Sequence, residues 1–184
     1  MLPKKLLSKL ISFNHKESLV SSGDRLLIAL SGGPDSVCLT HFLWHLSKKM
    51  PLSLYLLHLH HGLRGRSANQ DASFAKRLAQ LLGLPVFIEK IKVKQTAQKE
   101  GRSLEDAGRA LRYRTIEIFA TKLGCNKVAT GHHLDDQAET FLLHLLRGTK
   151  AKGLAGIPPK RLLRFARTTK KIELIRPLLA LTRK

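Results

Sequence analysis

Short apolar runs alternate along the chain with longer segments in which apolar residues recur at helical spacing. The short runs lack a regular polar alternation, which is typical of strands buried on both faces, and they predict strands at 25–30, 52–60, 85–93 and 127–131. The longer segments predict helices at 36–49, 67–83, 103–124 and 134–148. Regular alternation of strands and helices predicts an α/β fold built on a doubly wound, mainly parallel sheet.

The two ends of the chain differ from this central pattern. Residues 1–23 are basic and carry apolar residues at helical spacing, so we expect an N-terminal amphipathic helix rather than a signal peptide. Residues 24–184 then form one domain. Its tail, 150–184, contains eleven Lys and Arg but only one acid, Glu173. Within the tail, 161–169 and 171–181 favour a hairpin or edge strands.

The chain is strongly basic, because it contains 33 Lys and Arg but only 13 Asp and Glu, which gives a formal net charge of +20. Self-repulsion on this scale destabilises a compact chain, so a polyanionic partner is expected, and nucleic acid is the leading candidate. A general bias of the source proteome toward basic residues is the alternative explanation.

The two cysteines, Cys38 and Cys125, lie far apart in the sequence and in apolar surroundings. This spacing argues against a disulfide scaffold, a zinc ribbon and an iron–sulfur cluster held by this chain alone. No apolar run approaches the length of a membrane span. We therefore expect a cytoplasmic protein with reduced thiols.

The segment SGGPDS, 31–36, follows the first predicted strand and leads directly into a helix. A helix N-terminus offers backbone N–H groups to an anion, and glycines allow a phosphate to approach the backbone. Asp35 suggests a Mg²⁺ ion that bridges it to the phosphates. The segment is not a Walker A loop, and the alternative is an ordinary turn in which Asp35 complements the helix dipole.

Polar clusters follow the first, second and fourth predicted strands, at 31–36, 60–66 and 131–136. Because ligands bind beyond the carboxyl ends of parallel strands, the three clusters predict one shared site.

In the cluster after the fourth strand, Gly131 would let a nucleotide lie against the backbone. Asp136 and Glu139 fall on one helical face, where the two carboxylates would hold Mg²⁺. The same spacing is also that of a helix-capping box, and a zinc site formed by His132, His133 and Asp136 is a poorer alternative.

Arg109 and Arg112 share one side of the predicted helix 103–124 and would reach phosphate groups. A solvated basic face, paired with Glu105 or Asp106, is the alternative.

The SGGPDS segment resembles the phosphate-binding loop of the N-type ATP pyrophosphatase (PP-loop) superfamily, whose fold is adenine nucleotide alpha hydrolase-like. Four further segments resemble the tRNA(Ile)-lysidine synthetase family: HLHHGLRGRS (58–67), SLEDAGRALRY (103–113), GHHLDDQAETFLLHLLRGTKAKGLAGI (131–157) and RPLLALTR (176–183). Gly108 stands where this family usually has Ala.

The resemblance implies a carbon–nitrogen ligase that uses ATP and Mg²⁺ to attach free L-lysine to C2 of the wobble cytidine. The RNA is tRNA(Ile) with a CAU anticodon, and the reaction passes through an adenylated tRNA and releases AMP and pyrophosphate. It also implies C-terminal tRNA-binding domains, which are absent from this sequence, and it leaves a homodimer open.

The residues that the resemblance and the motifs together assign fall into four groups. We expect catalytic roles for Asp35, Arg112, Asp136 and Glu139. We expect the Mg²⁺ ligands to be Asp35, Asp136 and Glu139. We expect ATP contacts from Ala29, Ser31, Gly32, Gly33, Pro34, Asp35, Ser36, His58, Arg109, Gly131 and His132. We expect tRNA contacts from Arg64, Arg147, Lys150, Lys152, Arg161 and Arg164.

Two other functions stay open from the sequence. A PP-loop tRNA thiolase uses the same adenylation chemistry, but it would need a suitably placed cysteine or cluster motif. A basic RNA-binding module with a vestigial nucleotide site is the second alternative.

Overall fold

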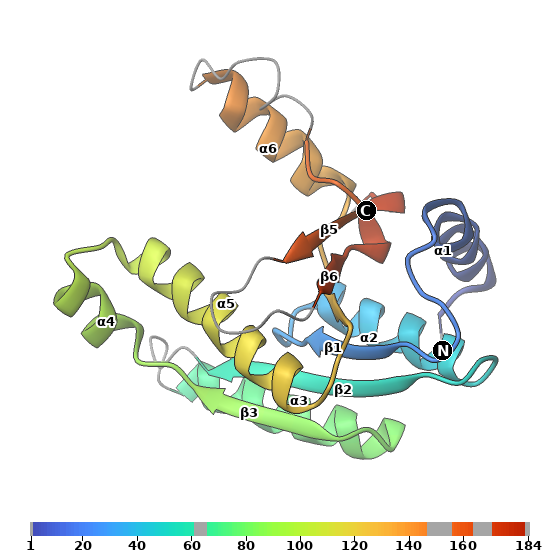
Figure 1. The fold of residues 1–184 in the computed structure, drawn as a ribbon, viewed down its shortest axis with the longest axis horizontal. Coiled ribbons are helices and arrows are strands. Elements are labelled where there is room, and N and C mark those ends of the chain that lie inside the picture. Colours follow the sequence, from blue (N-terminus) through green and yellow to red (C-terminus); the bar gives the residue numbers. More distant parts are fainter. Residues whose placement is uncertain (1, 61–65, 147–155, 164–170, 183–184) are drawn as a thin grey trace.

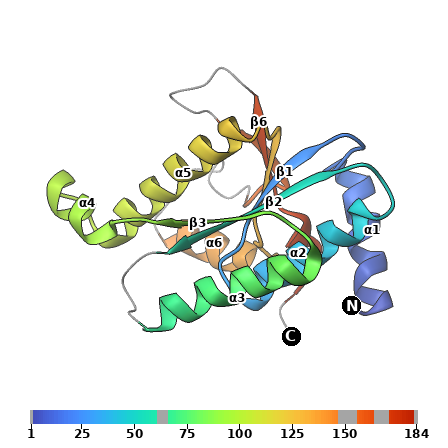
Figure 2. The same cartoon turned by 90° about the horizontal axis from the view of Figure 1, so that it is seen from below.

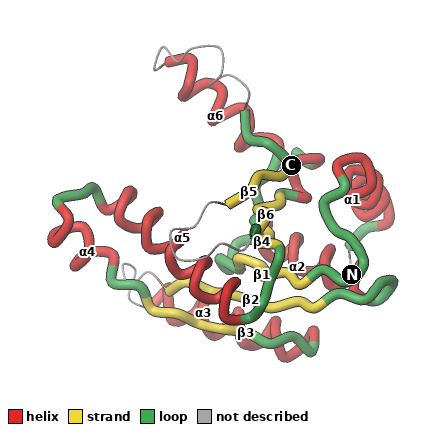
Figure 3. Tube along the Cα trace, in the orientation of Figure 1, coloured by secondary structure: helices red, strands yellow, loops and turns green. Residues whose placement is uncertain are grey.

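The computed structural model describes residues 2–60, 66–146, 156–163 and 171–182, which build one six-stranded sheet flanked by helices (Figures 1 and 3). The strand order is β3-β2-β1-β4-β6-β5, and every neighbouring pair is parallel except β5 with β6. The strands are β1 (Arg25–Ala29), β2 (Ser53–His60), β3 (Val86–Lys90), β4 (Lys127–Ala129), β5 (Lys160–Leu163) and β6 (Ile172–Ile175). The prediction of a doubly wound, mainly parallel sheet is confirmed.

Helices cover both faces of this sheet (Figure 2). They are α1 (Lys4–Glu17), α2 (Pro34–Ser47), α3 (Arg66–Leu82), α4 (Val93–Glu100), α5 (Leu104–Lys122) and α6 (Leu134–Leu146), followed by the 3₁₀ helix η2 (Pro177–Ala180). On one face, Leu26 and Ile28 of β1 pack in a core shared with α1, α2 and α3. On the other face, Leu27 packs with Ile116 and Ala120 of α5. Successive residues of β1 thus face opposite layers, as a fully buried strand requires.

The N-terminal helix belongs to the main core. Leu10 of α1 is fully buried in the same cluster as Phe42 and Leu178. The apolar stripe predicted within 1–23 therefore packs against η2 and shares a core cluster with α2, and the residues after the helix lead straight into β1. No helix in the described part of the chain is long and apolar enough to cross a bilayer.

The structure differs from the sequence prediction in two places. The strand predicted over 85–93 ends at Lys90, and a short helix, α4, begins at Val93. This helix has a mostly polar sequence, and it is held by Val93 and Ala97, which bury against Ala107 of α5. In the tail, β5 and β6 form the predicted antiparallel pair, and β6 also extends the main sheet through parallel pairing with β4.

A buried ion pair ties the start of β1 to β4 at the amino ends of the strands. Lys127 Nζ lies 2.8 Å from Asp24 Oδ2 and donates a hydrogen bond to the Leu19 carbonyl oxygen at 2.7 Å. Burial by itself would raise the pKa of Asp24, but hydrogen bonds from Lys127, Ser21 and Asn126 outweigh burial and lower this pKa. The pair links the connection after α1 to the middle of the sheet.

Replacing Lys127 with Met would leave the Asp24 carboxylate buried without its counter-charge. We expect the free energy of unfolding to fall by about 3–5 kcal/mol, measured by urea denaturation at pH 7. Lys122→Met, at an exposed position at the end of α5, is the matched control and should change little. An equal effect of both substitutions would contradict the role of the pair. Because folding lowers the pKa of Asp24, the ionised carboxylate stabilises the folded protein at pH values above its usual pKa of 3.8. This stabilisation is lost as the pH falls below 3.8 and through the lowered pKa of the folded state.

Candidate functional site

The loop between β1 and α2 is preformed around its two serines. The Ser31 N–H donates to Ser36 Oγ at 3.2 Å, and the Ser36 hydroxyl donates to the Gly33 carbonyl oxygen at 2.9 Å. Gly32 has a φ of +91°, which favours glycine. Helix α2 begins with Pro34, and its N-cap residue, Gly33, offers no side chain to its first-turn N–H groups. The helix N-terminus therefore presents backbone donors suited to a phosphate.

Gly131, in the loop after β4, packs directly on this helix N-terminus. A Cβ atom at position 131 would lie 3.1 Å from both the Asp35 carbonyl carbon and the Ser36 nitrogen. These neighbours are backbone atoms of the first turn of α2, so they cannot move aside as a flexible side chain would. A Cβ at position 131 would require this backbone to shift, so glycine favours the close approach of the two loops.

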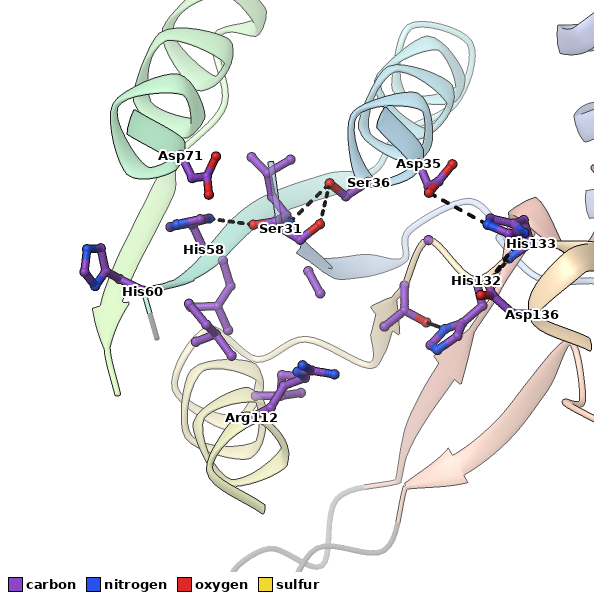
Figure 4. A pocket seen from close by; sticks show the side chains of 17 residues that line it. Ser31, Asp35, Ser36, His58, His60, Asp71, Arg112, His132, His133 and Asp136 are labelled. Atoms are coloured by element: carbon purple, nitrogen blue, oxygen red, sulfur yellow. Dashed lines mark hydrogen bonds and ion pairs between the residues drawn. The ribbon is translucent and has the colours of Figure 1, made fainter. Parts of the chain in front are cut away.

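A pocket of about 610 Å³ opens at the carboxyl edge of the sheet, where the loops after β1 and β4 meet α3, α5 and α6 (Figure 4). The ends of β1 and β2 form its apolar floor, together with Ile116 of α5. It is lined by Ala29, Leu30, Ser31, Asp35, Ser36, Leu57, His58, Leu59, His60, Asp71, Arg112, Ile116, Thr130, Gly131, His132, His133 and Asp136. The three polar clusters predicted to share a site contribute to it through Ser31, His60 and Gly131.

Buried His133 brings two of the pocket carboxylates together (Figure 4). Its Nε2 lies 3.9 Å from Asp35 Oδ2, and its Nδ1 lies 3.7 Å from Asp136 Oδ2. The His133 backbone N–H also donates to Asp136 Oδ2 at 2.7 Å. Asp136 is the third residue of α6 and caps the helix start by accepting this bond, so the capping interaction lies between His133 and Asp136 rather than between Asp136 and Glu139 as predicted. Asp136 lines the pocket at the same time.

The carboxylates of Asp35 and Asp136 suit Mg²⁺, which commonly takes one or two carboxylates and completes its shell with phosphate oxygens and water. Within the described residues, no group of three or more His, Cys, Asp or Glu is arranged to hold a metal by itself. Glu139 is exposed on α6 and does not line the pocket. Any divalent ion here would therefore depend on the nucleotide phosphates for most of its ligands.

Among the described residues, one arginine, Arg112, lines the pocket, as does the histidine His132. Arg112 points into the pocket from α5 (Figure 4). Burial, and then the positive charges of Arg176 and Arg112, lower the pKa of His132. The His132 ring is therefore neutral at pH 7, and its Nδ1 lies 2.9 Å from the Thr130 hydroxyl. Acidic and basic side chains occupy different walls of the same pocket.

Arg109 lies outside the pocket lining and instead stacks on Tyr113. Its guanidinium carbon is 5.7 Å from the centre of the Tyr113 ring, and that of Arg161 is 5.8 Å from the same ring. Arg161 also donates to the Tyr113 hydroxyl at 2.9 Å. The two arginines and the tyrosine form an exposed basic patch between α5 and β5.

Most of the residues expected from the sequence come together. Those that line the pocket are Ala29, Ser31, Asp35, Ser36, His58, Arg112, Gly131, His132 and Asp136. Gly32, Gly33 and Pro34 complete the adjoining loop. Arg109, Glu139 and Arg161 lie outside the lining. Arg64, Arg147, Lys150, Lys152 and Arg164 lie outside the described residues.

Four polar lining residues, Asp71, His60, Thr130 and His133, carry no assigned role from the sequence motifs. Asp71, on α3, stands against the phosphate loop, with its Oδ1 3.4 Å from the position of a Cβ on Gly32. No motif marks it, because its place depends on the packing of α3 across β2. The sequence marks His60 only as part of a polar cluster, and its Nε2 lies 3.1 Å from Asn69 Oδ1.

A mainly parallel sheet has, after its first strand, a glycine-containing loop suited to phosphate, and a glycine after β4 packs against this loop. Together with the acid at the start of α6, these features are those of a PP-loop protein. Residues 4–184 match the PP-loop domain family ATP_bind_3, and the chain belongs to that family.

Relatives with curated names align with nearly the whole chain. The tRNA(Ile)-lysidine synthase of Dehalococcoides mccartyi is 43% identical over 97% of this chain, and that of Symbiobacterium thermophilum is 42% identical over 97%. The chain spans 38% and 36% of the length of these two relatives.

Among solved structures, the U34-tRNA thiolase NcsA from Methanococcus maripaludis aligns with a TM-score of 0.75 at 20% identity. The alignment covers 96% of this chain and 59% of that one. The NAD synthetase from Campylobacter jejuni aligns with a TM-score of 0.53 at 18% identity, over 81% of this chain and 62% of the other. At these identities the likeness establishes the fold.

Substituting Gly131 with Ala tests the contact between the two loops. The added methyl group would be overpacked against backbone, at a cost of about 1–3 kcal/mol, and should push the loop away from α2. We expect ATP to bind roughly tenfold more weakly, measured by isothermal titration calorimetry. Gly108→Ala is the control, because a Cβ there meets only Val93, at 3.7 Å, and Ala favours the helix. ATP affinity that is unchanged in Gly131→Ala would show that the contact does not shape the nucleotide site.

Proposed function

We propose that this chain is the catalytic part of a tRNA(Ile)-lysidine synthetase, which uses ATP to ligate lysine to the wobble cytidine of tRNA(Ile). The observation that carries the proposal is the pocket itself, in which a phosphate loop, two carboxylates and Arg112 surround one cavity. Relatives named tRNA(Ile)-lysidine synthase align across the segments that build this cavity.

In the first step, the N–H groups of the loop and the start of α2 hold the β- and γ-phosphates of ATP. The C2 oxygen of the cytidine attacks the α-phosphate, so the P–O bond to the β-phosphate breaks and pyrophosphate leaves. The loop donors and Arg112 stabilise the charge that develops on the phosphates. Mg²⁺, where bound at Asp35 and Asp136, would offset the same charge.

In the second step, the ε-amine of lysine attacks C2 of the adenylated base and AMP leaves. The ammonium group must first lose a proton, which requires a base near the reacting carbon. Asp136 suits this role better than Glu139, because Asp136 lines the pocket and Glu139 does not. Asp35 then stays available for the nucleotide.

The RNA partner follows from the charge distribution. A net charge of +20 favours a polyanion, and the patch of Arg109, Tyr113 and Arg161 offers exposed cations and an aromatic ring beside the pocket. We expect this patch to contact tRNA together with Arg64, Arg147, Lys150, Lys152 and Arg164, in a cytoplasmic protein.

The thiolase alternative is less well supported. Burial raises the pKa of Cys125 to about 11, and burial, with the negative charge of Asp35, raises the pKa of Cys38. Both thiols are therefore protonated at pH 7, and neither lines the pocket.

Transfer of labelled lysine to RNA tests the proposed function. With ATP and a tRNA(Ile) transcript that carries the CAU anticodon, we expect radiolabelled lysine to become acid-precipitable with the RNA. The matched control is the same transcript with uridine at the wobble position, which should accept no label. Equal labelling of both transcripts, or product formation that depends on a sulfur donor, would contradict the proposal.

The Asp136→Asn substitution separates the two roles of this side chain. Asn can still accept the His133 N–H, so α6 keeps its cap, but the charge and the base are lost. We expect lysine transfer to fall by roughly 100-fold or more. Asp135→Asn is the neighbouring control: Asp135 lies near His133 but not in the pocket lining, so its variant should stay close to wild type. Full activity of Asp136→Asn would remove both the metal and the base assignments.

A further inference from the structure

Asp71 is a carboxylate on the inward face of α3. Toward the end of this helix the same face carries Phe74, Ala75 and Leu78, which pack in the main core. Asp71 lies beyond the first turn of α3, which begins at Arg66, so it does not cap the start of the helix. A charge on an apolar helical stripe is destabilising unless it has a partner or binds a ligand.

The described residues provide no partner for this carboxylate. Asp71 forms no hydrogen bond or ion pair with them, whereas the other two pocket acids, Asp35 and Asp136, lie near His133. Side chains three and four residues apart are the ones that pair along a helix. At these distances from Asp71, α3 carries uncharged residues, namely Ser67, Ala68, Phe74 and Ala75. The charge of Asp71 is therefore left for a ligand of the pocket.

The Asp71 side chain lies against the phosphate loop, where it lines the pocket (Figure 4). Its Oδ1 is 3.4 Å from the position that a Cβ on Gly32 would occupy. His58, which is 3% exposed, lines the pocket as well, and its Nδ1 lies 2.8 Å from the Leu30 carbonyl oxygen. A carbonyl oxygen only accepts hydrogen bonds, so this nitrogen carries a proton, and Nε2 of the neutral ring is an acceptor. Beside the loop, Asp71 and His58 thus contribute acceptors and negative charge.

The lining of the pocket is acidic, although the chain as a whole is basic. Among the described residues it contains three carboxylates, those of Asp35, Asp71 and Asp136, and one arginine, Arg112. The triphosphate of ATP would add several negative charges next to Asp71, and like charges at such short range repel each other strongly. A divalent cation between a carboxylate and a phosphate turns this repulsion into attraction.

We propose that Asp71 is a specificity-determining residue that admits the phosphates of ATP only together with a divalent cation. The proposal rests on the ATP-binding step of the proposed function. Without the cation, the Asp71 carboxylate repels the β- and γ-phosphates at the loop. With the cation, the same carboxylate faces a positive charge, and Mg²⁺ keeps water molecules that donate hydrogen bonds to acceptors such as Asp71 and His58. Selection of this kind depends on a repulsive element that acts against the wrong form of the ligand.

The experiment measures the binding of α,β-methylene-ATP, which resists cleavage between its α- and β-phosphates, by isothermal titration calorimetry with excess Mg²⁺ or with EDTA. We expect wild-type protein to bind the analogue more tightly with Mg²⁺. Asp71→Asn should bind the metal-free analogue roughly tenfold more tightly than wild type does, with no gain for the Mg²⁺ form. Glu105→Gln is the matched control, because it removes one exposed negative charge outside the pocket lining and should keep the wild-type ratio between the two forms.

The results separate the possible roles of Asp71. An unchanged ratio between the two forms in Asp71→Asn, including equal losses with Mg²⁺ and with EDTA, would overturn the selection in favour of a purely structural role. AMP lacks the β- and γ-phosphates and should bind equally well to wild type and Asp71→Asn. A change in AMP affinity as large as that for the metal-free analogue would overturn the selection in favour of a contact to the nucleoside. If Asp71→Asn does not fold, Asp71→Ala provides the same comparison, and an unchanged ratio there overturns the selection.

Failure of the selection differs from failure of the proposed function. Wild-type protein that binds the analogue neither with Mg²⁺ nor with EDTA contradicts the use of ATP, and the selection falls with it. Wild-type protein that transfers lysine to the CAU transcript but binds both forms of the analogue equally well contradicts the selection alone.

Discussion

The site depends on one close approach between backbones, that of Gly131 to the first turn of α2. A Cβ at position 131 would lie 3.1 Å from main-chain atoms of Asp35 and Ser36, so the contact needs glycine. It joins two loops that are far apart in the sequence, and it brings the carboxylates of Asp35 and Asp136 to the same histidine. The parallel sheet makes the contact possible, because β1 and β4 are neighbours and end at the same edge.

The second organising feature is the separation of charge across the pocket. The carboxylates lie on the walls formed by α2, α3 and α6, whereas Arg112 lies on the wall formed by α5. Such a division suits a reaction that brings together a polyphosphate with its cation and an amino acid that carries both charges.

Much of this arrangement could be predicted from the sequence, because the signals are local. The apolar runs around Leu27 and Leu56 predict buried strands, and the SGGPDS segment predicts a turn into a helix N-terminus. Parallel topology then brings the strand ends together without further information. For the same reason the sequence alone predicts that Gly131, His132 and Asp136 lie near Ser31.

The features that could not be predicted depend on packing between distant segments. Asp71 reaches the phosphate loop only because α3 packs across β2, and no motif marks that residue. Glu139 shares a helical face with Asp136 by spacing, yet it lies beyond the pocket, because α6 leads away from the site after its first turn (Figure 1). The burial of Arg176 is likewise invisible in the sequence, because it depends on the pairing of β6 with both β4 and β5.

The proposed cleavage of ATP can be tested by product analysis of ATP labelled at the α-phosphate, incubated with the protein, the CAU transcript and lysine. We predict labelled AMP and unlabelled pyrophosphate in equal amounts, because we propose that the loop after β1 binds the β- and γ-phosphates as the leaving group. Labelled ADP with free phosphate would show that the bond between the β- and γ-phosphates breaks instead, and that result would contradict the role assigned to the loop.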